Sequence, residues 1–152
     1  MQINIYSITK KDSAYQALQE ELCMKCKQFG VQITHFELFP KAIKEAQKIS
    51  MHKARNAYTQ VFMPYLNTAA LNVSLDPSGE SVDSIAFAHL IESKHLVQFF
   101  IGGAYGLENS FVKLTKAVSL SAMTFSHKIA KLVLCEQIYR ALSILASHPY
   151  HK

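Results

Sequence analysis

A regular alternation between short strand-like stretches and longer helical stretches is the feature that most constrains how this chain folds. Alternating apolar residues, or an unbroken apolar run bounded by turn residues, predict strands. The five predicted strands cover residues 2–8, 31–39, 69–75, 96–101 and 117–122. Strands and helices that follow one another in this order build a parallel sheet. We therefore predict an α/β fold, with a mostly parallel sheet of five or six strands and helices on both faces, formed by residues 1–152 as one domain.

Turn and capping residues indicate where the intervening helices begin and end. Asp12 and Ser13 are predicted to cap a first helix, and Gly30 is predicted to end it. Pro40 fits the first turn of a long basic helix, which is expected to end before Pro64. The remaining predicted elements are a turn at 76–79 and helices over 82–93, 107–116 and 128–146.

Composition limits the class of protein and its compartment. With 49% hydrophobic residues in 152, the chain has enough apolar surface to build a core without disulfides or a structural metal. No apolar stretch reaches the roughly 18 residues of a membrane span, and the start has no signal-like pattern. An odd number of cysteines, three in all, fits a reducing compartment. We expect a cytoplasmic protein with no membrane partner.

Two groups of residues have some of the features of a metal site. Cys23 and Cys26 have the C-x-x-C spacing, but they fall within a predicted helix and no second cysteine pair completes four ligands. His148 and His151 flank Pro149, with no carboxylate cluster beside them. The sequence therefore predicts no metal site.

Positive charge is concentrated in one stretch of the chain, whose formal net charge is +5. Five cations stand against Glu45 alone there: Lys41, Lys44, Lys48, Lys53 and Arg55. Their spacing of three to five residues places much of this charge on overlapping helix faces. Such a face can contact RNA phosphates without reading a base sequence, and a solvated helix face is the alternative.

A glycine-rich segment follows the most apolar predicted strand. It reads Ile101-Gly102-Gly103-Ala104-Tyr105-Gly106, and paired glycines at a strand's carboxyl end permit close approach of a ligand. The GGxxG spacing differs from the GxGxxG of dinucleotide-binding folds, and it follows the fourth strand rather than the first. A nicotinamide site is therefore not expected, and a simple turn is the alternative to a ligand site.

Five short motifs, taken in order, resemble those of one known family. They are Leu75-Asp76-Pro77-Ser78-Gly79, Ile101-Gly102-Gly103 with Gly106-Leu107, Ser119 to Thr124 with His127, Glu136 to Ala141, and His148-Pro149-Tyr150-His151-Lys152. Their order and spacing, and the chain length, are similar to those of the bacterial large-subunit ribosomal RNA pseudouridine N3-methyltransferases (the RlmH family), of the knotted SPOUT class. The resemblance implies a carboxyl-terminal trefoil knot, S-adenosylmethionine as cofactor and a homodimer.

The resemblance also assigns site residues. The cofactor wall falls on Leu75, Gly102, Gly103, Ser121, Ala122, Met123, Thr124, Phe125 and Ser126. Candidate catalytic residues, expected near the partner subunit's cofactor, are Arg140, His148, Tyr150 and His151. The expected RNA surface combines the five cations above with His127 and Lys152.

The resemblance implies methylation of N3 of a pseudouridine in 23S ribosomal RNA within the ribosome. Two positions depart from the family pattern: Ala104-Tyr105 stands where Pro-Glu is common, and Lys128 where a proline often follows the histidine. A related SPOUT methyltransferase acting on tRNA is one alternative. A non-catalytic ribosome-binding factor on the same scaffold is the other.

Overall fold

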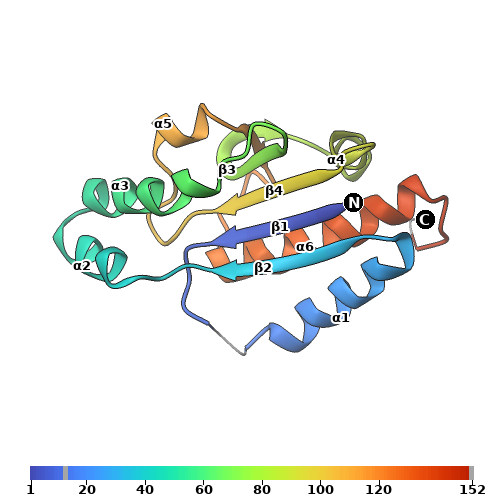
Figure 1. Ribbon diagram of the computed structural model, residues 1–152, viewed down its shortest axis with the longest axis horizontal. Coiled ribbons are helices and arrows are strands. Elements are labelled where there is room, and N and C mark those ends of the chain that lie inside the picture. Colours follow the sequence, from blue (N-terminus) through green and yellow to red (C-terminus); the bar gives the residue numbers. More distant parts are fainter. Residues whose placement is uncertain (12–13, 151–152) are drawn as a thin grey trace.

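Five strands join into one sheet in the computed structural model, which describes residues 1–11 and 14–150 (Figure 1). They are β1 (Gln2–Ser7), β2 (Gln32–Glu37), β3 (Leu71–Ser81), β4 (Leu96–Ile101) and β5 (Lys116–Ser119). Their order across the sheet is β2-β1-β4-β3-β5, and every pair of neighbours is parallel. The predicted parallel α/β sheet is confirmed, with five strands in the described residues.

Helices cover both faces of this sheet. One face packs against α1 (Gln16–Cys26), α4 (Ser84–Ile91) and α6 (His127–Leu145), and the other against α2 (Lys41–Ile49), α3 (Met51–Phe62) and α5 (Asn109–Val112). Single 3₁₀ turns, η1 (Lys27–Phe29) and η2 (Met63–Tyr65), extend α1 and α3. The apolar run of β4 has a simple explanation. Val97 and Phe99 pack in the core on the α1, α4 and α6 face, whereas Phe100 packs in the core on the α2, α3 and α5 face. Both faces of the strand are therefore buried.

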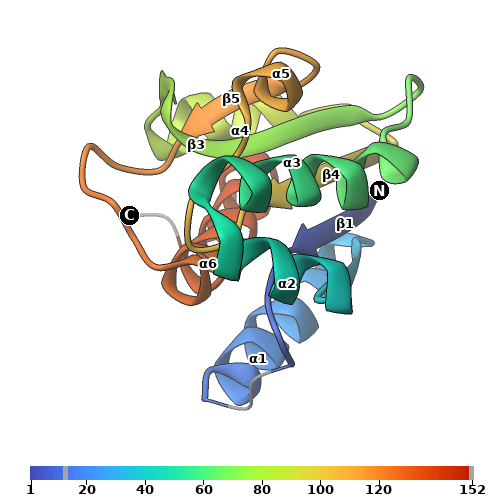
Figure 2. The ribbon, with the colours of Figure 1, turned by 90° about the vertical axis from the view of Figure 1, so that its left-hand side faces the viewer.

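The predicted long basic helix is in fact two helices, and Ser50 separates them. Ser50 has an extended backbone (φ −167°, ψ 162°). Its Oγ accepts a hydrogen bond from the backbone N–H of Lys53 at 3.1 Å. A serine in this role ends one helix and caps the next. The prediction of a continuous helix was therefore wrong, and α2 and α3 lie as a pair beyond the carboxyl ends of the strands (Figure 2).

The third strand does not end at Asp76 as predicted. Its pairing with β5 shifts register, so that Leu75 and Glu80 both lie opposite Val118, and the residues between them bulge out. Asp76 Oδ1 accepts hydrogen bonds from the N–H and the hydroxyl of Ser78 at 2.9 and 2.6 Å. The turn chemistry of this segment is present, but it forms a bulge within a strand that continues to Ser81.

Other element bounds differ by a few residues from the predicted ones. The fifth strand ends at Ser119 rather than at residue 122, and the helix expected over 107–116 is the single turn α5. Gly30 ends the first helical segment with a positive φ of 69°, as predicted. The expected cap at Asp12 and Ser13 lies outside the described residues.

The longest helix connects the two ends of the sheet. α6 begins beside the carboxyl ends of the strands and runs antiparallel to them, toward their amino ends (Figure 1). Its 19 residues span about 28 Å at 1.5 Å per residue. Among the described residues, no helix combines the length and apolar character needed to cross a bilayer.

Candidate active site

A pocket lies beside the carboxyl ends of β4 and β5 and the bulge of β3, on the side of a parallel sheet where ligands are expected to bind. Its volume is about 140 Å³. It is lined by Leu75, Asp76, Pro77, Ile101, Gly102, Gly103, Ala104, Gly106, Ser119, Leu120, Ser121, Met123, Thr124, Phe125, His127 and Ala130. These residues come from the bulge of β3, from the ends of β4 and β5 with the segments that follow them, and from the first turn of α6. The structure thus brings together seven of the nine residues expected at the cofactor wall; Ala122 and Ser126 are the exceptions.

The glycine loop forms one wall of this pocket, and tight packing explains two of its glycines. A Cβ on Gly103 would lie 2.7 Å from the ring and hydroxyl of Tyr58. A Cβ on Gly102 would lie 3.1 Å from the Gly106 backbone and the Leu107 side chain. Gly106 has a positive φ of 74°, which favours glycine. The loop is therefore held close to the protein by atoms that leave no space for side chains.

The segment 120–126 forms the opposite wall and is held by serines. Ser119 Oγ donates to the carbonyl of Ser121 at 2.9 Å, and Ser121 Oγ accepts from the N–H of Met123 at 3.0 Å. The N–H groups of Ala122, Thr124 and Phe125 donate to no protein acceptor within the described residues. Backbone donors that remain open beside apolar side chains suit a ligand with a flat ring and polar edges.

Ser126 does not line the pocket but caps the amino-terminal end of α6. Its Oγ accepts from the N–H of Ile129 at 3.4 Å and caps α6. His127 begins the helix and lines the pocket. An N-cap serine aligns the first turn of the helix with the pocket, and this explains why residue 126 itself does not face it.

The predicted catalytic residues lie at the other end of α6. Arg140 donates through Nε and an Nη to the same carboxylate oxygen of Glu136, at 2.9 and 2.6 Å. The Tyr150 hydroxyl donates to that oxygen at 3.1 Å, and the guanidinium lies 4.9 Å from the centre of the Tyr150 ring. His148 packs edge-on against Phe29, with ring centres 5.8 Å apart. We call Glu136, Arg140, His148 and Tyr150 the tail cluster.

The electrostatics of the tail cluster favour particular protonation states. The hydrogen bonds to Glu136 raise the pKa of Arg140 above its usual value, so this group stays cationic. Burial, and then the Glu136 carboxylate, raise the pKa of the Tyr150 hydroxyl. Tyr150 is thus a proton donor at neutral pH and is poorly suited to be a base. His148 Nδ1 accepts from the N–H of Tyr150 at 3.3 Å. His151 and Lys152 lie outside the described residues.

The tail cluster and the pocket are far apart within one chain. Phe29, which contacts His148, comes just before β2 begins at Gln32, at the amino-terminal edge of the sheet. The pocket lies at the carboxyl-terminal edge. Among the described residues, one chain therefore does not bring Arg140, His148 or Tyr150 to the predicted cofactor residues.

The basic residues divide between two helices at the pocket end of the molecule. Lys41, Lys44 and Lys48 are exposed on α2, and Lys53 is exposed on α3. Lys48 forms a 3.3 Å ion pair with Glu45. Together they form an exposed basic surface.

Arg55 contacts the glycine loop, which its position in the sequence does not predict. Its Nε donates to the backbone carbonyl of Tyr105 at 2.7 Å, which ties α3 to the glycine loop. No sequence signal connects two residues fifty positions apart, and the spacing of the basic residues indicated only a role toward RNA. Arg55 therefore supports the wall of the pocket directly.

Comparison with known proteins gives a consistent result over the full chain. The family model described as "Predicted SPOUT methyltransferase" matches residues 1–151. The protein called ribosomal RNA large subunit methyltransferase H of Helicobacter hepaticus is 69% identical, with all of both chains covered. Proteins of the same name from Helicobacter acinonychis and Helicobacter pylori (strain Shi470) are 51% and 48% identical, again with both chains fully covered.

Proposed function

This chain belongs to the SPOUT methyltransferase family, and from that premise we propose that it methylates N3 of a pseudouridine in large-subunit (23S) ribosomal RNA, with S-adenosylmethionine as methyl donor and as a homodimer. The similar proteins carry a name that specifies large-subunit ribosomal RNA. The observation that carries the proposal is the pocket at the bulge of β3 and the ends of β4 and β5, which unites glycines, apolar side chains and open backbone donors.

The residues of the pocket fit an adenosyl group in chemistry. Leu75, Leu120 and Met123 offer apolar contacts to a ring. The open N–H groups of the 120–126 segment would be available to donate hydrogen bonds to the ring nitrogens of an adenine. The 140 Å³ enclosed by one chain is below the roughly 300–1,000 Å³ of typical ligand pockets. Movement of the segment, where the Met123 side chain is 74% exposed, or a second chain must supply the rest.

The proposed chemistry needs two functions from the protein. When bound, S-adenosylmethionine supplies an electrophilic methyl group on a sulfonium centre. The protein must place the nucleophilic nitrogen in line with that methyl, which contributes several kcal/mol through positioning. It must also assist loss of the N3 imide proton, by a base or by cations that stabilise the deprotonated ring.

The tail cluster is suited to the second function. Arg140 remains cationic beside Glu136 and is able to stabilise a ring that has lost its proton. Tyr150 is a hydrogen-bond donor, and His148 carries an imidazole that is able to move a proton. We assign stabilisation of the deprotonated ring to Arg140. We assign the role of general base to one of the two carboxyl-terminal histidines, His148 or His151.

The separation of these two half-sites supports the proposed homodimer. The pocket lies beside the start of α6, whereas the tail cluster lies along the second half of α6 and beyond its end. A twofold dimer brings the same surface of two chains together, so that the tail of one copy reaches the pocket of the other. The trefoil knot implied by the family belongs to the same proposal, with the 120–126 segment as part of the knotted region.

Transfer of labelled methyl from S-adenosylmethionine to ribosomes that lack the modification tests the proposal. A parallel sample contains ribosomes whose target uridine was never converted to pseudouridine. We expect incorporation in the first sample alone. Incorporation into bulk tRNA, but not into ribosomes, would contradict the substrate. Absence of both transfer and saturable cofactor binding would contradict the enzyme itself.

A further inference from the structure

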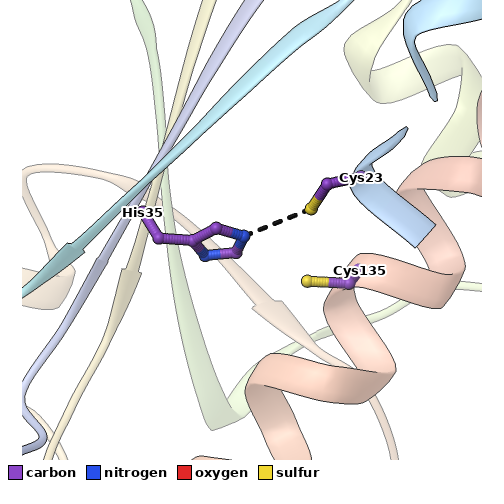
Figure 3. A group of neighbouring side chains, drawn as sticks. All are labelled: Cys23, His35 and Cys135. Atoms are coloured by element: carbon purple, nitrogen blue, oxygen red, sulfur yellow. Dashed lines mark hydrogen bonds between the residues drawn. The ribbon is translucent and has the colours of Figure 1, made fainter. Parts of the chain in front are cut away.

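Three metal-ligating side chains from distant parts of the sequence meet on the face of the sheet away from α2 and α3. Cys23 comes from α1, His35 from β2 and Cys135 from α6. Their two sulfurs and one ring nitrogen all lie within 4.8 Å of one another. Figure 3 shows the imidazole of His35 and both thiols converging on one space.

We propose that Cys23, His35 and Cys135 bind a thiophilic divalent cation, zinc being the simplest occupant. Zinc bonds are about 2.3 Å to sulfur and 2.0–2.1 Å to nitrogen. A tetrahedral ion therefore holds sulfur and nitrogen about 3.5 Å apart, and two sulfurs about 3.8 Å apart. The observed 3.2 Å between Cys23 Sγ and His35 Nε2 needs only a small expansion to admit the ion.

The ligand chemistry agrees with this choice of metal. Two thiolates and one imidazole are soft and borderline ligands, which favour zinc over magnesium or calcium. Two thiolates also neutralise a divalent ion, so that the occupied site adds no net charge to a partly buried place. The His35 ring has no other fixed partner, because its Nδ1 accepts or donates no hydrogen bond within the described residues.

Space beside the cluster allows a fourth ligand. A cavity of about 910 Å³ lies between α1, β2 and α6, and Cys23 and His35 are part of its wall. Three protein ligands and one open position are typical of sites where a metal holds water or an external ligand. The buried Lys131, paired with Glu37 at 2.8 Å, also lines this cavity.

Neither Cys26 nor the pocket at the strand ends takes part. The C-x-x-C spacing indicated a pair of neighbouring cysteines, but Cys26 does not belong to the group of ligands. The prediction of no metal depended on the absence of a second cysteine pair in the sequence. The tertiary structure instead supplies His35 and Cys135, which makes Cys26 the matched control for Cys23.

Cobalt(II), which occupies zinc sites and is coloured, gives the direct test. The reduced full-length protein, kept with a phosphine reductant, is titrated with cobalt(II) and then with zinc(II). We expect one equivalent of cobalt to produce thiolate-to-metal charge-transfer absorption, and zinc to remove it. Histidines near the carboxyl terminus have no thiolate and do not produce this band. Cobalt bound there is therefore not mistaken for cobalt at the proposed site.

Variants at the ligands distinguish this site from any other. Cys23→Ser and His35→Gln should each weaken binding by about a hundredfold or more, since even outer-shell partners are worth about 10- to 100-fold. Cys135→Ser should do the same, but its burial makes a folding check by circular dichroism necessary. Cys26→Ala should bind cobalt as the unchanged protein does. A band that persists in Cys23→Ser, or that disappears in Cys26→Ala, overturns the proposal.

A second measurement does not depend on colour. Zinc at a hundredfold excess over its Kd should raise the Tm by roughly 5–10 °C, and a chelator should reverse the rise. If the mass of the protein instead shows loss of two hydrogens on air oxidation, and no cobalt band forms after reduction, the cluster is a disulfide pair and the metal proposal fails. None of the three ligands lines the pocket or belongs to the tail cluster, so failure of the metal proposal leaves the proposed function to be judged by the methyl-transfer assay alone.

Discussion

The pocket at the start of α6 and the tail cluster farther along it are built from different kinds of groups. At the pocket end, glycines, serines and open backbone donors form the walls. At the tail end, charged and aromatic side chains form a hydrogen-bonded cluster around Glu136. Backbone N–H groups are suited to bind a ligand that many enzymes share. Charged and aromatic side chains are suited to chemistry on one particular substrate. Under the proposed homodimer, the tail cluster of one chain would meet the pocket of the other.

Removal of residues 147–152, the carboxyl-terminal tail, should have the largest effect on methyl transfer. We expect a chain that ends after Ala146 to lose methyl transfer by at least a hundredfold, the lower range for loss of a positioned acid or base. The fold should survive, because α6 ends at Leu145. Transfer assays with circular dichroism measure both. Full activity in a folded protein would remove the tail from the mechanism.

Complementation tests whether the two half-sites come from different chains. Ala104→Trp should fill the pocket without disturbing the core, since Ala104 is an exposed residue of its wall. Each inactive chain alone should give no transfer. Coexpression of this variant with the tail-truncated chain should restore about a quarter of normal activity, because half of the dimers then contain one complete site of two. Mixed dimers without activity would place both half-sites in one chain.

Substitution of Arg140 separates charge from geometry. Arg140→Ala should lower kcat by roughly 10- to 100-fold, from loss of one charge-stabilising group. Arg140→Lys should recover only part of it, because an ammonium does not reproduce the planar fork. The free energy of unfolding should change by about 1 kcal/mol or less, since ion pairs near the surface contribute little. Denaturant titration beside steady-state kinetics checks both, and equal activity of all three proteins would contradict the assignment.

Substitution of the lysines on α2 should have the smallest effect. It should change ribosome binding and leave catalysis unchanged. Changing Lys41, Lys44 and Lys48 together to Gln should weaken ribosome binding and flatten its dependence on salt. Each lost phosphate contact reduces the slope of log K against log salt by roughly 0.7–0.9. Lys94→Gln with Lys113→Gln is the control, because both lysines are exposed and lie outside α2 and α3. An unchanged slope would show that α2 faces solvent.

The pocket was largely predictable from sequence, because its position depends on local rules. Strand-like patterns placed the end of β4 correctly, and the paired glycines marked one wall, whereas the family resemblance supplied the other lining residues. The break at Ser50 was also readable, since serine is a good N-cap, but the continuous run of basic residues favoured one helix. The bulge at Asp76 was not readable, because β3 resumes only through its pairing with β5.

The side-chain clusters could not be predicted, because they depend on how distant elements pack. Cys23, His35 and Cys135 come from three elements, and no spacing rule relates them. The bond from Arg55 to Tyr105 joins a helix to a loop in another part of the chain. In both cases the residue types were visible in the sequence, and only the fold brought them together.

The position of β1 in the sheet has a consequence for how the protein is made. The first strand of the chain lies between β2 and β4, with Gln2 opposite both Gln32 and Leu96. During translation, at about 5–20 residues per second, β1 waits for several seconds before its second neighbour exists. Until then its apolar side chains and one open edge remain available to other chains. We therefore expect a newborn chain to be most prone to wrong strand pairing at β1 while its middle third is being made.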